Sequence, residues 1–386
     1  MRTADVLIIG GGPAGSTCAW QLGRQGFDVV VWDRKPFPRD KICAGWITPH
    51  VVAALQLDLD AYVATGRTCQ PIFGFQVSRQ GDREARVRYS APVSYGIRRC
   101  EFDHYLLERC GAEQRLGDPL RTLERRDGHW VVNGAVRAPM LIGAGGHFCP
   151  VARRLGAQLG QGEPVVSAQE TEFALTPEQA RSCRVEQDLP EIFFTRDLKG
   201  YGWVFRKGDF INIGLGRQGN ERLGAHVAEF LQWLTARGKI PAELGGKMCG
   251  HPYLLYNQAP RPLVGDAAVL IGDAAGLAYA KSGEGIRPAI ESALLAASTI
   301  VEATGAYDAT HLAPYARRVV ERFGPRAVEA SVLDLLPEWM LGALAGQLFG
   351  ARWFARRVVL DDWFFHAQQP PLESSVPGSE GSRIQA

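Results

Sequence analysis

A glycine-rich loop near the start of the chain carries the first chemical signal. Gly10, Gly12 and Gly15 have the spacing G-x-G-x-x-G, they follow the apolar run V-L-I-I, and Asp33 lies eighteen residues after Gly15. In a strand–loop–helix unit such glycines permit a tight turn, let the backbone approach a pyrophosphate, and allow the helix to pack closely on the strand. The amides at the helix start would face the phosphates, and Asp33 would accept hydrogen bonds from a ribose. The spacing therefore predicts a dinucleotide-binding site.

A second loop of similar character lies near residue 270. The segment V-L-I-G-D-A-A-G (269–276) places Asp273 at the end of an apolar run and Gly276 at a helix start. A carboxylate there can hold a ribityl hydroxyl, while helix amides can face the other phosphate or the flavin ring. The first loop alone would fit NAD or FAD, because both contain an ADP half. Two such loops in one chain favour FAD.

Strands and helices are needed to hold these loops. The runs 5–10, 140–143 and 269–272 are short and apolar throughout, as expected of parallel strands with both faces covered. A helix over 16–25, closed by Gly26, and a strand over 27–32 complete a βαβ unit around the first loop. Helical spacing predicts further helices over 102–110 and 283–304. These elements form the expected cofactor domain.

Two other stretches have a different pattern. Residues 58–89 and about 161–254 contain short, partly alternating runs typical of an antiparallel sheet with one wet face. We therefore expect an α/β fold, α+β overall, in which a Rossmann-like FAD-binding domain is interleaved with an antiparallel-sheet substrate domain. The expected boundaries are 1–57, 95–160 and 255–314 for the first domain, 58–94 and 161–254 for the second, 315–367 for C-terminal helices, and 368–386 for a disordered tail.

Composition excludes several classes of function. The 43 Lys and Arg nearly balance the 41 Asp and Glu, and no block of like charge appears, so nucleic acid is not an expected partner. The eight cysteines are scattered, without a C-x-x-C pair or a Cys/His cluster, so neither a metal site nor a disulfide framework is expected. We expect a cytoplasmic protein, because no signal peptide precedes the first strand. The apolar stretch 332–349 is interrupted by Asp334, Pro337 and Glu338 and should not span a membrane.

Aromatic residues offer a candidate substrate surface. Tyr201, Trp203 and Phe205 alternate, so on a strand they share one face, which could line an apolar chamber or form an aromatic core. Glu170 and Glu172 also share a strand face, and we expect both to be solvated.

The C-terminal region could form a basic amphipathic surface for anionic lipid, although helices with a solvated basic face are the favoured interpretation. Its residues are Arg317, Arg318, Arg322, Arg352, Arg356, Arg357, Trp339, Phe349, Trp353 and Phe354.

Four motifs follow one another along the chain: the first glycine loop, R-x-x-F-D (99–103), G-A-G-G (143–146) and G-D-A-A-G (272–276). This order resembles the flavoprotein monooxygenase superfamily with the para-hydroxybenzoate hydroxylase fold. Within it, K-I-C-A-G (41–45), Y-G-W-V-F-R-K (201–207) and S-G-E-G-I (282–286) resemble the geranylgeranyl reductase branch. The resemblance covers roughly residues 3–366.

The resemblance implies FAD as the cofactor and NAD(P)H or a reduced partner protein as the electron donor. It places Arg99 at the cofactor's phosphates and Lys41 and Cys43 near the flavin ring. The residues expected at the cofactor are Gly10, Gly12, Pro13, Ala14, Gly15, Asp33, Arg34, Lys41, Cys43, Ala44, Arg99, Gly272, Asp273, Gly276, Gly283, Gly285 and Ile286. The expected catalytic residues are Cys43, Tyr201 and Trp203.

The activity that the resemblance implies is hydride transfer from reduced flavin to a C=C bond of an apolar isoprenoid or lipid-like substrate. Such a site needs an apolar chamber, supplied by the aromatic face, and a proton donor, supplied by Cys43. The alternative is a flavin-dependent monooxygenase or halogenase-related enzyme acting on an aromatic or amino-acid-derived substrate, because the fold serves both chemistries. A non-enzymatic flavin-binding electron carrier is the remaining hypothesis.

Overall fold

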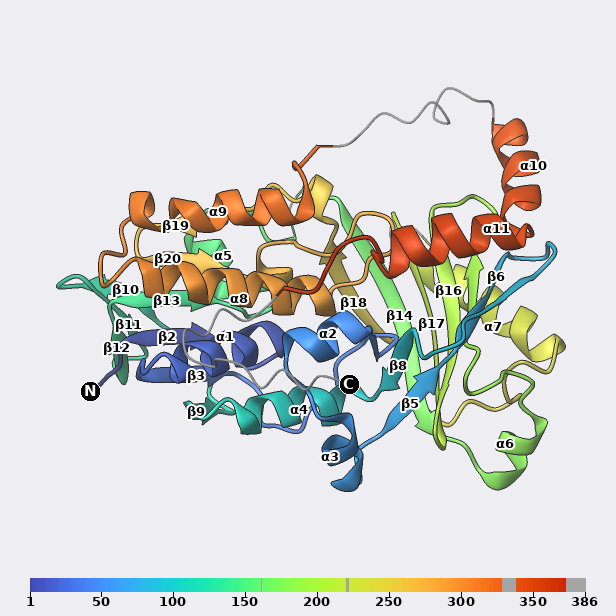
Figure 1. Cartoon of the computed structure of the whole chain (residues 1–386), viewed down its shortest axis with the longest axis horizontal. Helices are drawn as coiled ribbons and strands as arrows, with labels where there is room; N and C mark the ends of the chain where they lie inside the picture. The colour runs from blue at the N-terminus through green and yellow to red at the C-terminus, as the bar shows by residue number, and fades with distance from the viewer. Residues whose placement is uncertain (161, 220–221, 328–337, 373–386) are drawn as a thin grey trace, which may run out of the picture.

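The computed structural model describes residues 1–160, 162–219, 222–327 and 338–372 (Figure 1). A six-stranded sheet forms the first half, in the order β19-β20-β13-β2-β3-β9. All neighbours are parallel except the pair β19–β20. The strands are β2 (Val6–Ile9), β3 (Val29–Asp33), β9 (Glu113–Leu116), β13 (Met140–Gly143), β19 (Val264–Gly265) and β20 (Ala268–Leu270).

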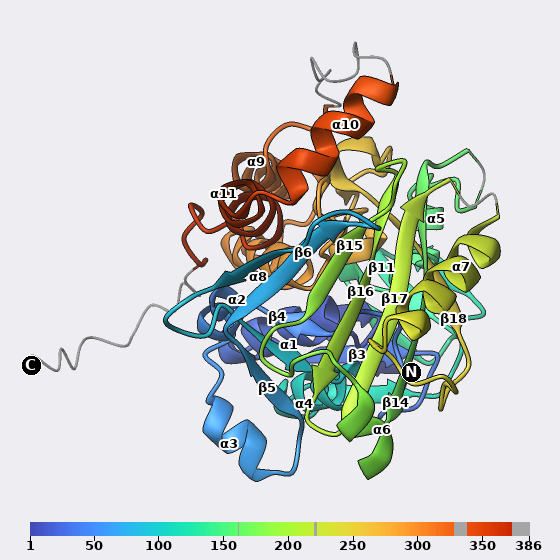
Figure 2. The ribbon, with the colours of Figure 1, turned by 90° about the vertical axis from the view of Figure 1, so that its right-hand side faces the viewer.

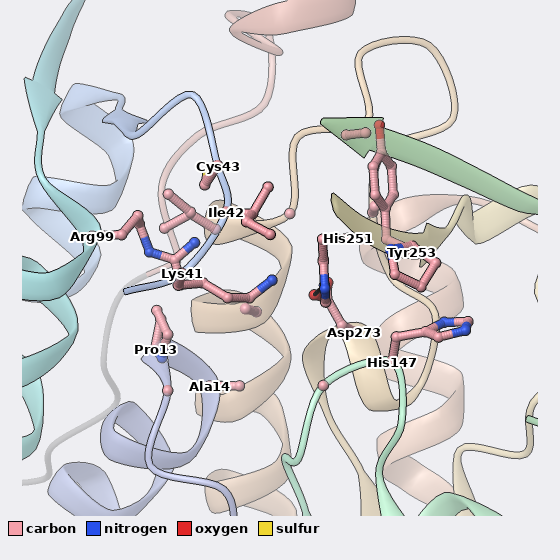
Figure 3. A pocket seen from close by; sticks show the side chains of 18 of the residues that line it. Pro13, Ala14, Lys41, Ile42, Cys43, Arg99, His147, His251, Tyr253 and Asp273 are labelled. Atoms are coloured by element: carbon pink, nitrogen blue, oxygen red, sulfur yellow. Dashed lines mark ion pairs between the residues drawn. The ribbon is translucent and has the colours of Figure 1, made fainter. Parts of the chain in front are cut away.

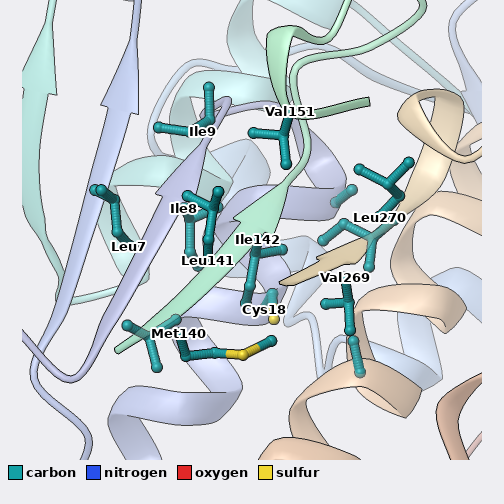
Figure 4. Packing of buried hydrophobic residues seen from close by; sticks show 14 of the residues in the cluster. Leu7, Ile8, Ile9, Cys18, Met140, Leu141, Ile142, Val151, Val269 and Leu270 are labelled. Atoms are coloured by element: carbon teal, nitrogen blue, oxygen red, sulfur yellow. The ribbon is translucent and has the colours of Figure 1, made fainter. Parts of the chain in front are cut away.

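The core of this half is aliphatic because its strands are buried on both faces (Figure 4). In register, Ile8 lies between Val31 and Ile142, and Ile142 pairs in turn with Val269. Two long helices, α1 and α8, pack on this sheet and on each other through small residues such as Cys18 and Ala293. The helices of this half are α1 (Pro13–Arg24), α4 (Arg99–Arg109), α5 (Pro150–Arg154), α8 (Ile286–Glu302) and α9 (Ala309–Phe323).

A four-stranded sheet that the sequence did not suggest packs on β2 and β13. Its order is β1-β12-β11-β10, and it buries Trp130, Val132 and Val136 against the aliphatic core. The strands are β1 (Arg2–Thr3), β10 (Leu123–Arg126), β11 (His129–Val132) and β12 (Val136–Ala138).

The second half is built on a seven-stranded sheet, in the order β18-β14-β17-β16-β15-β6-β7 (Figure 2). It is antiparallel as expected, except that β15 pairs with β6 in parallel, where the strands from the two separate stretches of chain meet. The strands are β6 (Gly74–Arg79), β7 (Ala85–Arg88), β14 (Val165–Ala174), β15 (Glu191–Phe194), β16 (Gly200–Lys207), β17 (Phe210–Gln218) and β18 (Cys249–Leu254).

Both faces of this sheet are covered, so its side chains divide between two cores. Phe193 and Val204 pack with Phe230 of α7 (Leu223–Ala236), near the short helix α6 (Pro177–Ser182). Their neighbours Trp203 and Phe205 point the other way, into a cluster that the C-terminal helices cover (Figure 2). These helices are α10 (Glu338–Phe349), α11 (Arg352–Phe354) and the π-helical segment η4 (Ala355–Phe364).

A small antiparallel sheet joins the two halves, in the order β4-β8-β5. One expectation for this region was wrong: residues 59–64 are helical, because the Asp58 side chain accepts a hydrogen bond from Ala61 N at 2.9 Å and caps the helix. The elements are β4 (Trp46–Ile47), α2 (Pro49–Ala54), α3 (Leu59–Ala64), β5 (Cys69–Ile72) and β8 (Ser94–Ile97).

Part of the expected C-terminal region lies within the described residues. The expected tail 368–386 begins within the described chain, where Arg287 Nη2 donates to Gln369 O at 3.0 Å and Arg322 Nη2 donates to Pro370 O at 2.7 Å. Residues 373–386, and residues 328–337 of the expected helical region, lie outside the described residues. Among the described helices, none is long and apolar enough to cross a membrane.

Candidate active site

A cavity of about 570 Å³ lies where the two halves meet (Figure 3). It brings together the three expected catalytic residues and all but three of the expected cofactor residues. The exceptions are Gly15, Gly272 and Gly276. The lining residues are Gly10, Gly12–Ala14, Asp33–Lys35, Arg39–Ala44, Trp46, Arg99, Ala144–Phe148, Ala168, Tyr201, Trp203, Cys249–Tyr253, Asp273, Ala278, Gly283–Ile286 and Ala289.

The glycines of the first loop have different tasks. A Cβ on Gly10, which has φ +116°, would lie 2.3 Å from the Ala144 carbonyl oxygen, and a Cβ on Gly15 would lie 1.8 Å from the Gly10 carbonyl oxygen. These two positions therefore require glycine for the packing of the chain itself. A Cβ on Gly12 would meet only the tip of Arg39, at 3.4 Å. Gly12 leaves space open toward the cavity.

The start of α1 offers an anion site at this open space. Gly12 is the N-cap residue, Pro13 occupies the first turn, no side chain caps the helix, and no acidic residue lies in its first turn. The amides of the first turn therefore face the cavity with the positive end of the helix dipole. Beside them, Asp33 Oδ2 accepts a hydrogen bond from Gly11 N at 2.8 Å, which fixes the loop while Asp33 still lines the cavity.

In the second loop the glycines pack against the rest of the protein, whereas Asp273 faces the cavity. A Cβ on Gly276 would lie 2.5 Å from Ala259 Cβ, and a Cβ on Gly272, which has φ +58°, would lie 3.1 Å from Ala14 Cβ. These glycines lie behind the cavity wall and allow the second loop to pack closely against its neighbours. Asp273 alone of the three presents its side chain to the cavity.

Basic side chains surround Asp273. Figure 3 shows the Lys41 amine extending toward His251 and Asp273, and His251 Nε2 lies 4.0 Å from Asp273 Oδ2. Burial acts to raise the pKa of Asp273, but His251, Lys41 and Arg99 outweigh it, so the net pKa lies below its usual range. Burial lowers the pKa of Lys41. Asp273 is therefore a carboxylate at neutral pH, and both of its oxygens can accept hydrogen bonds from ribityl hydroxyls.

An open helix start, a glycine whose Cβ would enter the cavity, and an ionised acceptor at the opposite wall together fit FAD. The chain's residues would hold its pyrophosphate at the α1 start, its ribose at Asp33, and its ribityl chain at Asp273.

Arg99 lines the cavity and is held in place by a buried ion pair. Its Nε and Nη2 donate to the two Asp103 carboxylate oxygens at 2.7 and 2.9 Å, and both side chains are buried. Burial acts to lower the pKa of Arg99, but Asp103 and Cys43 raise it, so the guanidinium remains charged. Cys43 is among the groups that raise the pKa of Arg99, and Gly45 N donates to Cys43 Sγ at 3.4 Å. The arginine thus makes the surroundings of the thiol positive.

The other end of the cavity is aromatic. Tyr201 and Trp203 of β16 line it together with Trp46 and Tyr253, whereas Phe205 packs behind them with its ring centroid 6.5 Å from that of Trp46. Tyr201 Oη donates to the Ser282 carbonyl oxygen, which ties this strand to the loop before α8. Burial raises the pKa of Tyr201 well above its ordinary value, so it stays a neutral phenol.

Several cavity residues were missed from the sequence. His147 directly follows the glycines of 143–146 but belongs to no motif itself, and His251 and Tyr253 lie on β18, which pairs with β14 across 79 or more residues of chain. His147 lies beside a buried ion pair in which Arg261 donates to Glu163 at 2.8 and 2.7 Å. Burial and Arg261 lower the pKa of His147 to about 4.

The expectation that Glu170 and Glu172 are solvated was wrong. Glu170 is 7% exposed, and Glu172 forms ion pairs with Lys207 Nζ at 2.6 Å and with Arg98 Nε at 3.2 Å. Both carboxylates lie behind the Cys43 segment rather than in solvent, because the neighbouring strands supply polar partners on this face of β14.

Comparisons with known proteins agree with this geometry. Residues 5–85 match a family model described as FAD dependent oxidoreductase. The chain is 30% identical over 321 residues to menaquinone reductase of Mycobacterium tuberculosis, covering 77% of this chain and 76% of the relative. It is 25% identical to digeranylgeranylglycerophospholipid reductase 2 of Methanosphaera stadtmanae, covering 84% of this chain and 85% of the relative.

The fold has a close match among solved structures. A geranylgeranyl bacteriochlorophyll reductase-like protein from Thermoplasma acidophilum superposes with a TM-score of 0.74 at 20% identity, covering 96% of this chain and 97% of that protein. The predictions of an FAD-binding α/β fold and of FAD as the cofactor are thereby confirmed. The chain belongs to the FAD-dependent oxidoreductases of the geranylgeranyl reductase-like family.

Proposed function

We propose that the protein reduces C=C bonds of an isoprenoid or lipid-like substrate. The observation that carries this proposal is the continuity of the cavity, which runs from the open α1 start past Cys43 to the aromatic wall of Tyr201, Trp203, Trp46 and Tyr253. Such a wall suits an apolar polyene chain and has few groups to recognise a polar substrate. The name of the Methanosphaera relative, a digeranylgeranylglycerophospholipid reductase, supports the same substrate class.

In this proposal the residues around the cavity have different roles in the reaction. FAD, once reduced, supplies the hydride to the alkene. The aromatic wall holds the alkene and excludes water, while Cys43 gives the proton from Sγ to the adjacent carbon. Arg99 and the Gly45 amide then stabilise the thiolate until it is reprotonated from solvent.

The electrons and the lipid must both reach this site from outside. We propose NAD(P)H or a reduced partner protein as the electron donor.

We also propose peripheral contact with membranes through η4 and α11. The exposed residues there are Arg352, Arg356, Arg357 and Trp353, of which Trp353 is 61% exposed. Trp353→Ala should reduce cosedimentation with anionic vesicles, whereas Val63→Ala, at an exposed apolar residue of α3, should not; equal binding by both would remove this surface.

Product mass tests the reaction itself. The flavin of the holoprotein is reduced without air and mixed with a prenyl alkene, and in parallel with oxygen. The proposal requires a gain of two hydrogens in the product. A gain of one oxygen would instead make the protein a monooxygenase, and the absence of any product with fast reoxidation by electron acceptors would make it a carrier.

A further inference from the structure

A buried polar cluster lies directly behind Cys43 and lines no part of the cavity. Its centre is the Asn212 amide of β17, whose Nδ2 lies 3.1 Å from the Cys43 carbonyl oxygen, 3.1 Å from Glu170 Oε2, and 3.2 Å from Glu172 Oε2. The Asn212 Oδ1 in turn accepts a hydrogen bond from Trp203 Nε1 at 2.7 Å. One side chain therefore links the proposed proton donor, a cavity-lining indole and two carboxylates.

The Asn212 side-chain nitrogen has fewer hydrogens than it has acceptor oxygens around it. An amide nitrogen carries two hydrogens, and three oxygens lie within hydrogen-bond distance of it. Two of these oxygens belong to carboxylates of the same strand, Glu170 and Glu172, that approach one nitrogen. Two carboxylates that approach one nitrogen in a buried site favour a state in which only one of them is ionised.

The surrounding charges show which acid holds that proton. Glu172 is paired with Lys207, which is fully buried, and with Arg98, which also pairs with Glu101 at 2.7 Å. Two cations thus already balance two carboxylates. Glu170 has no ion pair with any described residue, and burial raises its pKa to about 7, opposed by Lys207, the Cys43 amide and Asn212. Neutral Glu170 leaves the cluster without net charge.

The cluster contacts the backbone that follows the Cys43 thiol at two places. The Cys43 carbonyl accepts from Asn212, and Lys207 lies so close to Gly45 that a Cβ there would be 2.4 Å from Nζ. Gly45 has φ +66°, which favours glycine at this turn. The cluster therefore holds the backbone between Cys43 and Gly45.

We propose that Glu170 holds a proton beside Asn212 while Glu172 is ionised, and that Glu170 is the positioning residue that couples this proton to the Cys43 thiol. The proposal gives Cys43 the role that it has in the proposed function, and adds the group that controls it. As Glu170 ionises, its negative charge behind the segment opposes formation of the Cys43 thiolate. Loss of the Glu170 proton and loss of the thiol proton thus oppose each other.

The rate of Cys43 alkylation by iodoacetamide measures this coupling without any substrate. The holoprotein is labelled at pH 6, 7 and 8, and the peptide that contains Cys43 is quantified by mass spectrometry. A thiol that titrates alone reacts about tenfold faster for each pH unit below its pKa, or about 100-fold over this range. For the wild type we expect only about a tenfold rise, because ionised Glu170 offsets about one pH unit.

Substitution assigns the effect to Glu170. Glu284 also lines the cavity, and burial raises its pKa to about 7, so the wild-type profile alone does not distinguish the two acids. Glu170→Gln keeps an oxygen for the Asn212 amide but cannot titrate, and should restore the full 100-fold rise. Glu170→Ala should do the same if the amide variant does not fold. The exposed Glu178→Gln of α6 is the matched control and should keep the wild-type profile.

Three results would overturn the proposal: a full 100-fold rise in the wild type, a reduced rise that persists in both Glu170 variants, or a uniform rate change at every pH. The last result would mean that Glu170 only supports the fold. Product mass remains a separate readout. If alkene reduction is absent while the alkylation profiles follow the expectation, the proposed function fails and the coupling stands.

Discussion

Gly12→Val should separate cofactor binding from folding more cleanly than any other change in the first loop. A Cβ at Gly12 would meet only Arg39 Nη2, at 3.4 Å, and the residue has φ −73° and ψ −174°, which any L-residue adopts. The variant should therefore fold as the wild type does. Its side chain would occupy the open space at the α1 start, where the pyrophosphate must approach.

The expected loss of affinity follows from the amides that this side chain screens. Hydrogen bonds to a charged group contribute about 1.5–3 kcal/mol each. Loss of two such bonds costs about 3–6 kcal/mol, which weakens FAD binding by roughly 10²- to 10⁴-fold. The variant should purify without colour.

The assay is FAD titration of apoprotein, followed by tryptophan or flavin fluorescence, beside thermal unfolding of the same sample. Gly23→Ala is the matched control on the same helix, because its Cβ would lie 3.7 Å from the nearest atom, the Cys110 carbonyl oxygen. It should bind FAD normally and gain up to about 1 kcal/mol of stability. Gly15→Ala should instead unfold readily, because its Cβ would lie 1.8 Å from Gly10 O.

Stoichiometric flavin in folded Gly12→Val would refute this reasoning. So would a Gly12→Val protein as unstable as Gly15→Ala, because the structure gives the two glycines different tasks.

Three further outcomes are expected. Asp273→Ala should weaken FAD binding roughly 10- to 150-fold in the same titration without loss of fold, since one hydrogen bond to a charged group is worth about 1.5–3 kcal/mol. Cys43→Ser should retain flavin content and its reduction but slow reoxidation by the alkene in stopped flow, because a hydroxyl is a far weaker acid than a thiol. Acidification from pH 6.5 to 4 should lower the melting temperature, because folded His147 has a pKa of about 4 and unfolded histidine one near 6.5, so the unfolded state binds more protons in this range. His147→Gln should remove part of that slope.

The elements around the first glycine loop were predictable because their signals are local. The run before Gly10 is buried on both faces, and the glycine spacing fixes where strand ends and helix begins, so β2, α1 and β3 follow from about thirty consecutive residues. The required packing of Gly10 and Gly15 acts on neighbours close in the chain or on the adjacent strand.

The seven-stranded sheet was harder to predict where its structure depends on distant strands. Alternation on β14 correctly indicates that Glu170 and Glu172 share a face, yet the sequence does not reveal what covers that face. Lys207 and Asn212 arrive from β16 and β17, and the Cys43 segment arrives from the other half of the molecule. Carboxylates on alternating positions usually face solvent, and here tertiary partners reverse that preference.

The segment from Arg39 to Gly45 connects the two ends of the cavity. Its lysine points toward Asp273 (Figure 3). Its cysteine carbonyl accepts from Asn212 behind the cavity, and Gly45 lies against Lys207. Cofactor contacts at Lys41 therefore constrain the same short stretch of backbone that the acid cluster holds at Cys43. FAD binding and the protonation of Glu170 should consequently influence each other, and by linkage the affinity for FAD should change between pH 6 and 8 in the wild type more than in Glu170→Gln. Parallel pH profiles for the two proteins would show that the segment transmits no such coupling.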